Sequence, residues 1–178
     1  MNETQIIKNW LDQHNIKYSA GQINGLMEYI DSVREFSLKL NLVSKNDLPH
    51  IIERHLLDSL QAFNVYEFKR DSKVGDIGSG AGFPGIPIAI MRPDIQMFLI
   101  ESRRKRSLFL SGVINQIGLA NAMVLNERWE DTTILFDVLL ARAVFPETEI
   151  INKSTPHLNP GGTILYYAKF NNIKVLKP

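Results

Sequence analysis

A glycine-rich segment near the middle of the chain constrains the fold more than any other feature. It covers residues 73–87 and reads KVGDIGSGAGFPGIP. An apolar strand with one embedded acid leads into Gly78, Gly80 and Gly82, and a helix is expected to begin at Pro84. Glycines at alternate positions let the backbone turn tightly and let a ligand approach without a Cβ in the way. We therefore predict a strand, a ligand-binding loop and a helix.

Two kinds of cofactor loop fit this segment. Gly80, Gly82 and Gly85 match the G-x-G-x-x-G pattern of dinucleotide sites, but such sites use free N–H groups at the helix start, and prolines lack them. The other pattern is hydrophobic-Asp-hydrophobic-Gly-x-Gly-x-Gly, with its acid at Asp76. It resembles the first motif of class I methyltransferases, whose cofactor S-adenosylmethionine carries no phosphate. A third interpretation is a plain turn in which Asp76 caps a neighbouring backbone.

The rest of the chain divides into a helical part and an alternating part. Apolar residues recur at helical spacing within residues 6–14, 23–40 and 51–63, and Asp47 is placed to cap the last of these helices. From Lys73 onward, strand patterns alternate with helix-length segments, which is typical of a parallel sheet with helices on its faces. Strands are predicted at 74–77, 96–100, 122–125, 137–141 and 163–167, with a helix end at Gly118 and a tight turn at 159–162.

Length and composition set limits on the class of protein. With 178 residues, the chain fits one domain, and its net charge of +1 means that any surface for a polyanion must be local. The absence of cysteine excludes disulfides, thiolate metal sites and a cysteine nucleophile. The charged N-terminus does not resemble a signal peptide, and no run of about 18 apolar residues could cross a bilayer. We expect a cytoplasmic protein with an N-terminal helical region over 1–70 and a core over 71–178, packed as one compact unit.

Two groups of residues around the second predicted strand are candidates for binding. Glu101 ends that strand about 20 residues past the glycine loop, where an acid can reach the ribose hydroxyls of an adenosine cofactor. Its alternative role is to cap the basic helix that follows. Arg103, Arg104, Lys105 and Arg106 open that helix, where the helix dipole disfavours cations. They are either solvated charges or contacts to the phosphates of a nucleic acid.

The ends of the third and fourth predicted strands carry further candidates. In doubly wound sheets the loops at the strand carboxyl ends surround the ligand. Trp129 therefore lies beside an adenine or is simply a packed aromatic, and Glu130 is placed to accept a hydrogen bond from the adenine amino group. Arg142 follows the fourth strand, and it could pair with Glu130 or Asp76, or contact the cofactor or the substrate.

The histidines do not indicate a metal site. His50 and His55 lack the spacing of a metal pair with a third ligand in view. Arg54 and His55, with Asp58 on the same predicted helix, indicate packing and ion pairing instead. We therefore predict no metal.

Several motifs taken together are specific for one family. They are RHLLDSL at 54–60, DIGSGAGFPGIP at 76–87, Lys105-Arg106 and Arg142-Ala143. This set resembles the glucose-inhibited-division protein B (GidB) family, the bacterial guanine-N7 methyltransferases of small-subunit (16S) ribosomal RNA. The resemblance implies an α/β, class I (Rossmann-like) S-adenosylmethionine methyltransferase, with a mostly parallel sheet, helices on both faces and an N-terminal helical extension. It also implies rRNA methylation, with S-adenosyl-L-methionine as cofactor and small-subunit rRNA or the small subunit as partner.

The resemblance assigns cofactor contacts to Gly78, Phe83, the Trp129–Glu130 pair and Arg142. The complete predicted cofactor site is Asp76, Gly78, Gly80, Gly82, Phe83, Glu101, Trp129, Glu130 and Arg142, and Arg142 is also a candidate for positioning the substrate. RNA contacts are predicted for Arg54, Arg103, Arg104, Lys105 and Arg106. Guanine N7 carries a lone pair and no proton, so positioning can supply most of the rate and no catalytic base is predicted. We expect a monomer.

The chain departs from the family pattern near its end. Lys169-Phe170 stands where members usually have Lys-Gly, and the sequence ends at Pro178, so we expect no final antiparallel hairpin and a short edge to the core. Other functions stay open. They are a methyltransferase acting on tRNA, protein or a small molecule, a nicotinamide dehydrogenase, and a non-catalytic ribosome-binding protein with the same fold.

Overall fold

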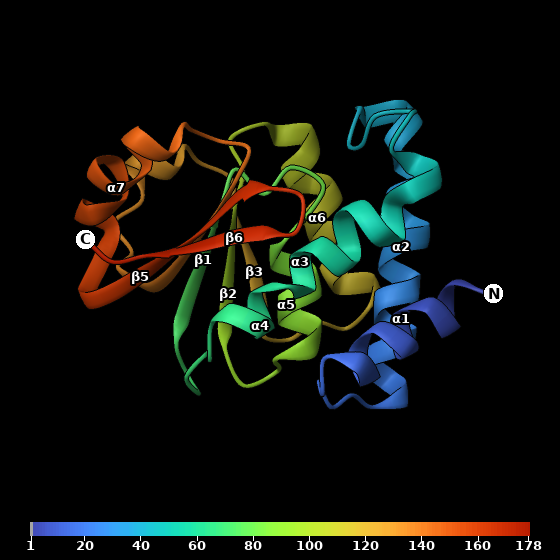
Figure 1. Cartoon of the computed structure of the whole chain (residues 1–178). Helices are drawn as coiled ribbons and strands as arrows, with labels where there is room; N and C mark the ends of the chain where they lie inside the picture. The colour runs from blue at the N-terminus through green and yellow to red at the C-terminus, as the bar shows by residue number, and fades with distance from the viewer. Residues whose placement is uncertain (1) are drawn as a thin grey trace.

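The computed structural model describes residues 2–178, so Met1, the first residue of the predicted helical region, lies outside it. The chain begins with helices and continues with alternating strands and helices, as predicted (Figure 1). The helical elements are α1 (Glu3–Gln13), α2 (Ala20–Leu40), η1 (Leu48–His50), η2 (Ile52–Leu57), α3 (Asp58–Leu60), α4 (Ala62–Val65), α5 (Gly85–Met91), α6 (Arg104–Gln116), η3 (Trp129–Asp131), α7 (Glu147–Ser154) and η4 (Thr155–His157). The strands are β1 (Lys73–Ile77), β2 (Gln96–Ile100), β3 (Ala122–Leu125), β4 (Phe136–Arg142), β5 (Leu158–Lys169) and β6 (Asn172–Leu176).

The strands of the described chain form one six-stranded sheet in the order β3-β2-β1-β4-β5-β6. The first five strands are parallel, and β6 runs antiparallel to β5. Because the order reverses after β1, the strands on either side of it leave a crevice at their carboxyl ends, where ligands bind in this class of sheet. The glycine loop follows β1 and therefore lies at this crevice.

Buried apolar side chains cover both faces of the sheet. On one face, Val74 and Leu99 belong to a cluster that also contains Leu11 of α1 and Leu26 of α2. On the other face, Ile77 and its neighbours pack with residues of α7 and with Trp129. Figure 1 shows the corresponding layers, with α7 on one side of the sheet and α5, α6 and the N-terminal helices on the other. The predicted division between 1–70 and 71–178 stays a prediction, although apolar contacts cross it.

The third predicted helix is not one regular α-helix. Leu48–His50 forms a 3₁₀ turn and Ile52–Leu57 a π-helix, before short α-helical turns complete the segment. Asp47 makes no side-chain cap. Within this segment the Asp58 N–H donates to the carbonyl of His55, and the carbonyl of Arg54 accepts from Arg142 Nη2 at 3.0 Å. π-Helical turns of this kind often occur at functional sites.

The C-terminal end of the sheet differs from the prediction in two ways. The predicted turn at 159–162 lies inside β5, in a bulge between the pairs Phe136–Leu158 and Val138–Thr163. The expectation of no antiparallel hairpin was wrong, because β6 pairs with β5 through a tight turn in which Asn171 adopts a φ of 56°. Asparagine tolerates this left-handed conformation better than most residues. The side chain of Asp58 also holds this turn, by accepting from the Asn171 N–H.

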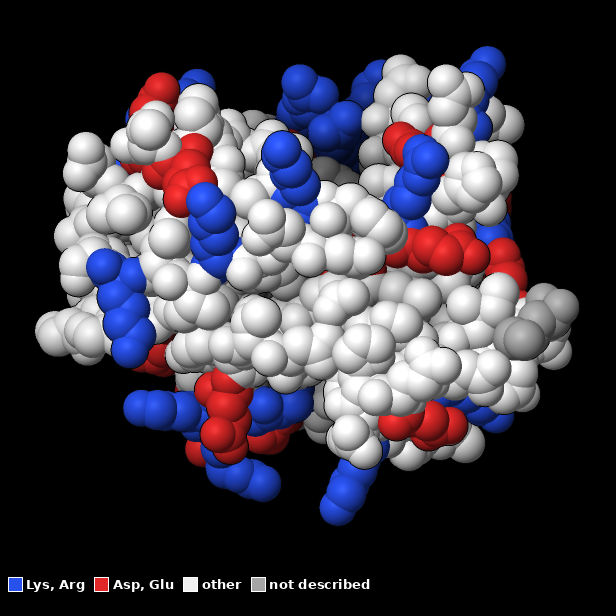
Figure 2. Space-filling view, viewed as in Figure 1, with Lys and Arg blue, Asp and Glu red and all other residues white. Residues whose placement is uncertain are grey.

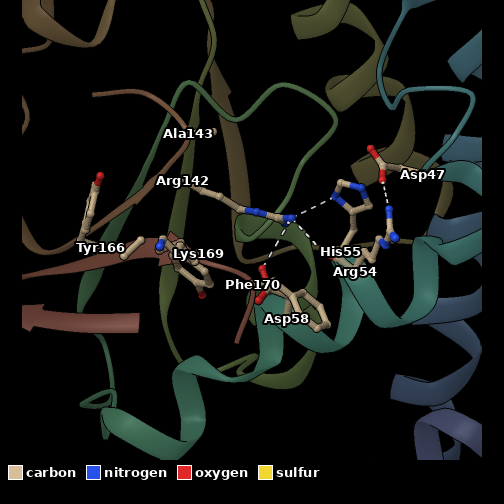
Figure 3. A pocket seen from close by; sticks show the side chains of 11 residues that line it. Asp47, Arg54, His55, Asp58, Arg142, Ala143, Tyr166, Lys169 and Phe170 are labelled. Atoms are coloured by element: carbon tan, nitrogen blue, oxygen red, sulfur yellow. Dashed lines mark hydrogen bonds and ion pairs between the residues drawn. The ribbon is translucent and has the colours of Figure 1, made fainter. Parts of the chain in front are cut away.

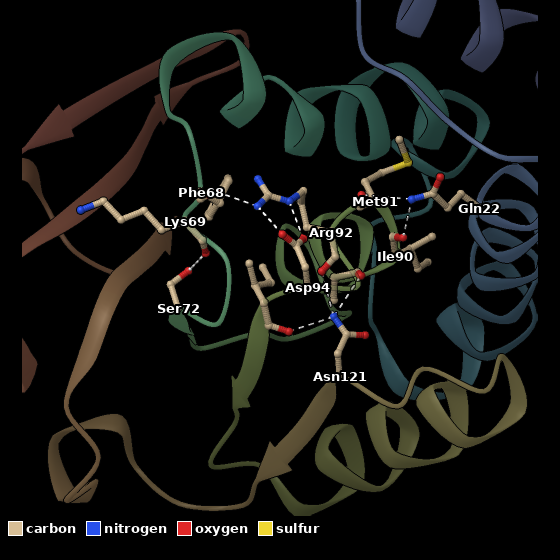
Figure 4. Close-up of polar contacts among 11 residues, drawn as sticks. Gln22, Phe68, Lys69, Ser72, Ile90, Met91, Arg92, Asp94 and Asn121 are labelled. Atoms are coloured by element: carbon tan, nitrogen blue, oxygen red, sulfur yellow. Dashed lines mark hydrogen bonds and ion pairs between the residues drawn. The ribbon is translucent and has the colours of Figure 1, made fainter.

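Side chains satisfy backbone groups at the edge of the sheet where the parallel strands begin (Figure 4). We call this the amino edge. The Asn121 amide donates to the carbonyls of Ala89, Arg92 and Ile95, and Gln22 of α2 donates to those of Ile90 and Met91. The last carbonyls of a helix have no partner within it, so these contacts complete the end of α5. The Gln22 contacts also tie α2 to α5.

Candidate active site

The glycine loop has the conformation that its sequence predicts. Gly78, Gly80 and Gly82 have φ values of 64°, 59° and 102°, which side chains with a Cβ rarely adopt. At Gly78 the space is also restricted, because a Cβ there would lie 2.8 Å from Cγ1 of Val144. The loop therefore passes directly against the segment that follows β4.

Two buried carboxylates hold the loop from inside. Asp76 is 1% exposed and accepts from the Gly85 N–H at 3.1 Å, and burial raises its pKa to about 7. Glu101 is 5% exposed, and its two oxygens accept from the N–H groups of Gly80 and Arg103 at 3.0 and 2.8 Å. Glu101 thus makes the helix-start contact that was its alternative role. The cofactor contacts of Asp76 and Glu101 stay predictions, and the observed role of both is to fix the loop.

The helix start offers few amides to a pyrophosphate. The Gly85 N–H donates to Asp76, and the N–H of Ile86 donates to the carbonyl of Gly82. The N–H of Ile88 donates to the carbonyl of Pro84. A dinucleotide site depends on free N–H groups at this position, so the geometry argues against the dinucleotide pattern.

A cavity of about 190 Å³ lies beside the glycine loop, and we call it the small cavity. Its walls come from the carboxyl ends of β1, β2 and β3 and from the segment after β4. The lining residues are Gly78, Ile100, Ser102, Glu127, Arg128, Trp129, Glu130, Val144 and Phe145. The predicted residues Gly78, Trp129 and Glu130 therefore meet in one place.

Trp129 is both packed and part of this cavity wall. Its ring lies 5.7 Å from that of Phe145 and 5.1 Å from that of His157. Its indole N–H is buried and has no hydrogen-bond partner within residues 2–178. Glu130 is exposed, and its nearest charged partner is Arg128 at 3.6 Å.

A larger cavity of about 550 Å³ lies on the other side of the β4 end, and we call it the large cavity (Figure 3). It is lined by Asp47, Arg54, His55, Asp58, Arg142, Ala143, Tyr166, Tyr167, Ala168, Lys169 and Phe170. These residues come from the irregular third helix, from β4 and β5, and from the turn after β5. Most of them were not predicted as site residues.

Arg142 reaches across this cavity to the third helix. Its Nη2 donates to the Arg54 carbonyl and to His55 Nδ1, each at 3.0 Å, and lies 3.5 Å from Asp58 Oδ2. It pairs with neither Glu130 nor Asp76 within the described chain, so those two suggested partners were wrong. The nearer carboxylate of Asp58 replaces them, because the third helix packs over the end of β4.

The electrostatics of the large cavity follow from this contact. Burial and the nearby Arg142 lower the pKa of His55 to about 4, so its ring is neutral at pH 7. Because Nδ1 accepts from Arg142, Nε2 carries the proton. Burial raises the pKa of Asp58, although the Asn171 N–H and Arg142 both favour its ionised form. His55 Nε2 and Arg142 Nη1 are buried and have no hydrogen-bond partner in the described part of the chain.

The two cavities share a wall of four consecutive residues. Arg142 and Ala143 line the large cavity, and Val144 and Phe145 line the small one. Ala143 has a φ of 55°, which turns the chain between the two. The two cavities therefore adjoin along this segment.

Phe83 lies apart from the small cavity. Its ring is buried between those of Tyr29 and His55, at 5.1 and 5.2 Å. The Tyr29 hydroxyl donates to the carbonyl of Ala81 at 3.0 Å. The N-terminal helix α2 thus braces the glycine loop, while the predicted cofactor contact of Phe83 stays a prediction.

The predicted RNA-binding cations occupy different environments. Arg103, Arg104 and Lys105 are exposed at the start of α6. Arg106 is half-buried and donates to the Asn41 carbonyl at 3.0 Å, and Arg54 is paired with Asp47 at 2.7 Å. Figure 2 shows Lys and Arg side chains gathered in a hollow at the top of the view, between the sheet and the N-terminal helices. Their contact with RNA stays a prediction.

Sequence reasoning missed that His55, Asp58 and Phe170 line the same cavity as Arg142. His55 and Asp58 were interpreted as packing and ion-pairing residues within one helix, yet their shared partner is Arg142 from β4. A signal was present in the RHLLDSL motif, which was quoted for the family but given no site role except at Arg54. Among residues 2–178, no three metal-binding side chains are grouped as a metal site requires, and no helix has the length and apolarity to cross a membrane.

A glycine loop after the first strand, at the switch point of a mostly parallel sheet, defines the Rossmann-like fold of S-adenosylmethionine methyltransferases. Solved structures share this fold. The M. jannaschii TYW2 structure in complex with AdoMet has a TM-score of 0.55 at 19% identity, covering 70% of this chain and 53% of that one. The P. horikoshii TYW2 structure in complex with MeSAdo has a TM-score of 0.55 at 22% identity, covering 64% and 43%.

Residues 22–176 match the GidB family, described as rRNA small subunit methyltransferase G, and the chain belongs to this family of S-adenosylmethionine-dependent enzymes. The ribosomal RNA small subunit methyltransferase G of Clostridium beijerinckii is 36% identical over 156 residues, which are 84% of this chain and 65% of that protein. The Chlorobaculum tepidum protein of the same name is 30% identical over 165 residues, covering 92% and 76%. The chain thus spans about two thirds to three quarters of these relatives.

Proposed function

We propose that this chain binds S-adenosylmethionine with its adenosine end in the small cavity and methylates N7 of a guanosine of small-subunit rRNA that enters the large cavity. The observation that carries the proposal is the shared wall of residues 142–145, along which the two cavities adjoin. A methyl transfer needs such adjacent sites because donor and acceptor must meet within near-contact distance. When bound, S-adenosylmethionine supplies an electrophilic methyl group.

The residues of the small cavity fit this cofactor. Gly78 lets a ligand approach the loop without a Cβ in the way. Glu101 lies between the lining residues Ile100 and Ser102, and its oxygens each accept one hydrogen bond and keep a further lone pair for a ribose hydroxyl. The buried indole N–H of Trp129 is a donor that still lacks an acceptor. An unpaired buried donor is costly, so a ligand acceptor would stabilise it.

The large cavity suits an acceptor that needs no deprotonation. Its carboxylates already have partners, since Asp58 contacts Arg142 and Asn171 and Asp47 pairs with Arg54. Guanine N7 has a free lone pair, so the reaction requires orientation and exclusion of water rather than a general base. In our proposal the unpaired Nη1 of Arg142 donates to the guanine O6, which lies next to N7. Arg142 then positions the base.

The RNA must present this base outside a regular duplex. N7 faces the major groove, which in A-form RNA is too narrow for side chains to read. The exposed cations at the start of α6 would contact phosphates beside the unpaired base and would make binding weaken with salt. Because ribosomes are cytoplasmic, we propose the same location for this protein.

The test is methyl transfer from labelled S-adenosylmethionine to small ribosomal subunits from cells that lack this protein. Naked rRNA and tRNA are assayed beside them, with an Arg142→Lys variant as control. We expect label on guanine N7 of the rRNA and a strong reduction in the variant. Label on tRNA alone, or cofactor binding without label on any RNA, would reject the proposal in favour of another substrate or a non-catalytic role.

A further inference from the structure

Phe170 is an exposed aromatic side chain at the edge of the large cavity. It presents 56% of its surface to solvent and lies in the turn between β5 and β6 (Figure 3). A single exposed apolar residue is ordinary on a protein surface. Phe170 differs because its turn is held in place and because of the side chains around it.

The turn that carries the ring is tied to the Arg142 site. The Asn171 N–H donates to Asp58 Oδ1 at 2.8 Å, and the Gln61 amide donates to Asn171 Oδ1 at 3.3 Å. The other oxygen of Asp58 lies 3.5 Å from Arg142 Nη2. One nearly buried carboxylate, with 3% of its side chain exposed, thus holds both the turn and the arginine. The backbone that carries the ring is therefore positioned before any ligand binds, which reduces the entropy cost of binding.

The surroundings of the ring suit a nucleotide better than an apolar partner. Arg54, Arg142 and Lys169 place three cations along the cavity against two acids, Asp47 and Asp58, and Tyr166 and Tyr167 add further aromatic rings. A purine nucleotide combines a flat apolar face with polar edges and an anionic phosphate, and each part finds a matching group here. The cavity volume of about 550 Å³ lies within the range of small-molecule sites, roughly 300–1,000 Å³.

Resting on the proposed function, we propose that Phe170 is the stacking platform of the acceptor site. The occupant is an unpaired purine base of RNA, whose face lies against the Phe170 ring and whose polar edge points toward Arg142. Stacking on an aromatic ring is tolerant of sequence because every base has such a face. Phe170 therefore supplies affinity, and the choice of base is left to polar groups such as Arg142.

A binding experiment tests this without requiring turnover. Protein saturated with S-adenosylhomocysteine, which blocks the cofactor cavity, is titrated with guanosine 5′-monophosphate in a calorimeter. We expect Phe170→Ala to weaken binding on the order of tenfold and Phe170→Trp to retain it. Leu38→Ala, which shortens an apolar side chain of α2 that is 67% exposed, is the matched control and should bind as the unchanged protein does.

Three results would overturn the inference. The first is that the unchanged protein does not bind the nucleotide. The second is that Phe170→Ala binds it with equal affinity. The third is that Phe170→Ala changes self-association and leaves nucleotide affinity unchanged, which would assign the ring to a protein contact.

Methyl transfer to small subunits separates this inference from the proposed function. Transfer that is equally efficient in Phe170→Ala would reject the platform and keep the function. If nucleotide binding depends on Phe170 as expected but the unchanged protein transfers no methyl group to small subunits, the stacking platform is supported and the proposed function is rejected.

Discussion

The two edges of the same parallel sheet are finished in opposite ways. At the amino edge, Asn121 and Gln22 satisfy the carbonyl groups that end α5, and Arg92 binds both Asp94 and the Phe68 carbonyl. At the carboxyl edge, donors of His55, Trp129 and Arg142 are buried without partners in the described chain. Unpaired buried donors reduce stability. The comparison teaches that one edge is built for stability and the other keeps binding capacity at a cost in stability.

The largest expected effect contrasts one arginine at each edge. Arg142→Lys keeps a charge near Asp58 but loses the planar set of donors, so methyl transfer should fall about 100- to 1,000-fold. The free energy of unfolding should also fall, by about 1–3 kcal/mol, because Arg142 contacts the nearly buried Asp58. Arg92→Lys should lose a similar amount, about 1 kcal/mol, but keep transfer per folded molecule unchanged. Single-turnover assays measure methyl transfer, and urea titrations measure the free energy of unfolding. An equal effect of the two variants on methyl transfer would remove the contrast between the edges.

Gly85→Ala should damage the carboxyl edge through a steric clash. A Cβ there would lie 2.5 Å from Leu99 Cδ2 and 2.7 Å from Asp76 Oδ2, and such overpacking costs about 1–3 kcal/mol. Gly112→Ala is the control, since nothing lies within 4 Å of its Cβ position in α6. That change should stabilise the protein by about 0.5–1 kcal/mol. Equal unfolding midpoints for both variants in guanidinium would contradict the packing around the loop.

Asn121→Ala tests whether the amino edge serves stability alone. The variant leaves three carbonyls without their side-chain donor, which should cost about 1–2 kcal/mol of unfolding free energy. Methyl transfer and cofactor affinity, measured on the folded fraction at low temperature, should match those of the unchanged protein. Reduced cofactor affinity in fully folded Asn121→Ala protein would show that the two edges of the sheet are coupled.

The smallest expected effect is a pH dependence at the carboxyl edge. The pKa of His55 is about 4 in the folded protein and about 6.5 when unfolded. The unfolded chain therefore takes up the proton first, and the stability that depends on neutral His55 is lost as pH falls from 6.5 toward 4. Between pH 6.5 and 5 the loss should be about 1 kcal/mol after allowance for partial exposure.

His55→Gln isolates this contribution in urea titrations across the same pH range. Asp76 acts in the opposite direction, because its raised pKa of about 7 means that its contribution falls as pH rises from 3.8 toward 7. Asp76 is present in both proteins, so its effect cancels when they are compared. The stability of the unchanged protein should fall more steeply with acid than that of the variant. Parallel pH profiles would show that His55 is not held neutral.

The sequence predicted what depends on local pattern. The strand after Lys73, the left-handed glycines and the alternation of strands and helices follow from the spacing of apolar residues and from glycine chemistry, both local properties. The meeting of Gly78, Trp129 and Glu130 at one edge follows from the parallel topology. These parts of the fold and of the small cavity are present in the structure.

The parts that failed depend on contacts between distant residues. No local pattern shows that Arg142 reaches Asp58 rather than Glu130, because the pairing depends on how the third helix packs on the sheet. The π-helical turn takes part in the same arrangement, because Arg142 donates to the Arg54 carbonyl within it. The β5–β6 hairpin was missed because the expectation rested on the family pattern at the chain end. It did not consider that Asn171 can adopt the left-handed conformation of a tight turn. Most of the large cavity was therefore beyond sequence reasoning.

The shared wall of residues 142–145 has a thermodynamic consequence. A ligand that shifts this segment in one cavity changes the affinity of the other cavity, and the coupling free energy must be the same in both directions. A cofactor analogue and a guanine nucleotide should therefore change each other's dissociation constants by one common factor. If that factor differs between the methylated and unmethylated forms of each ligand, the segment also makes the pair of products bind together more weakly or more strongly than the pair of substrates.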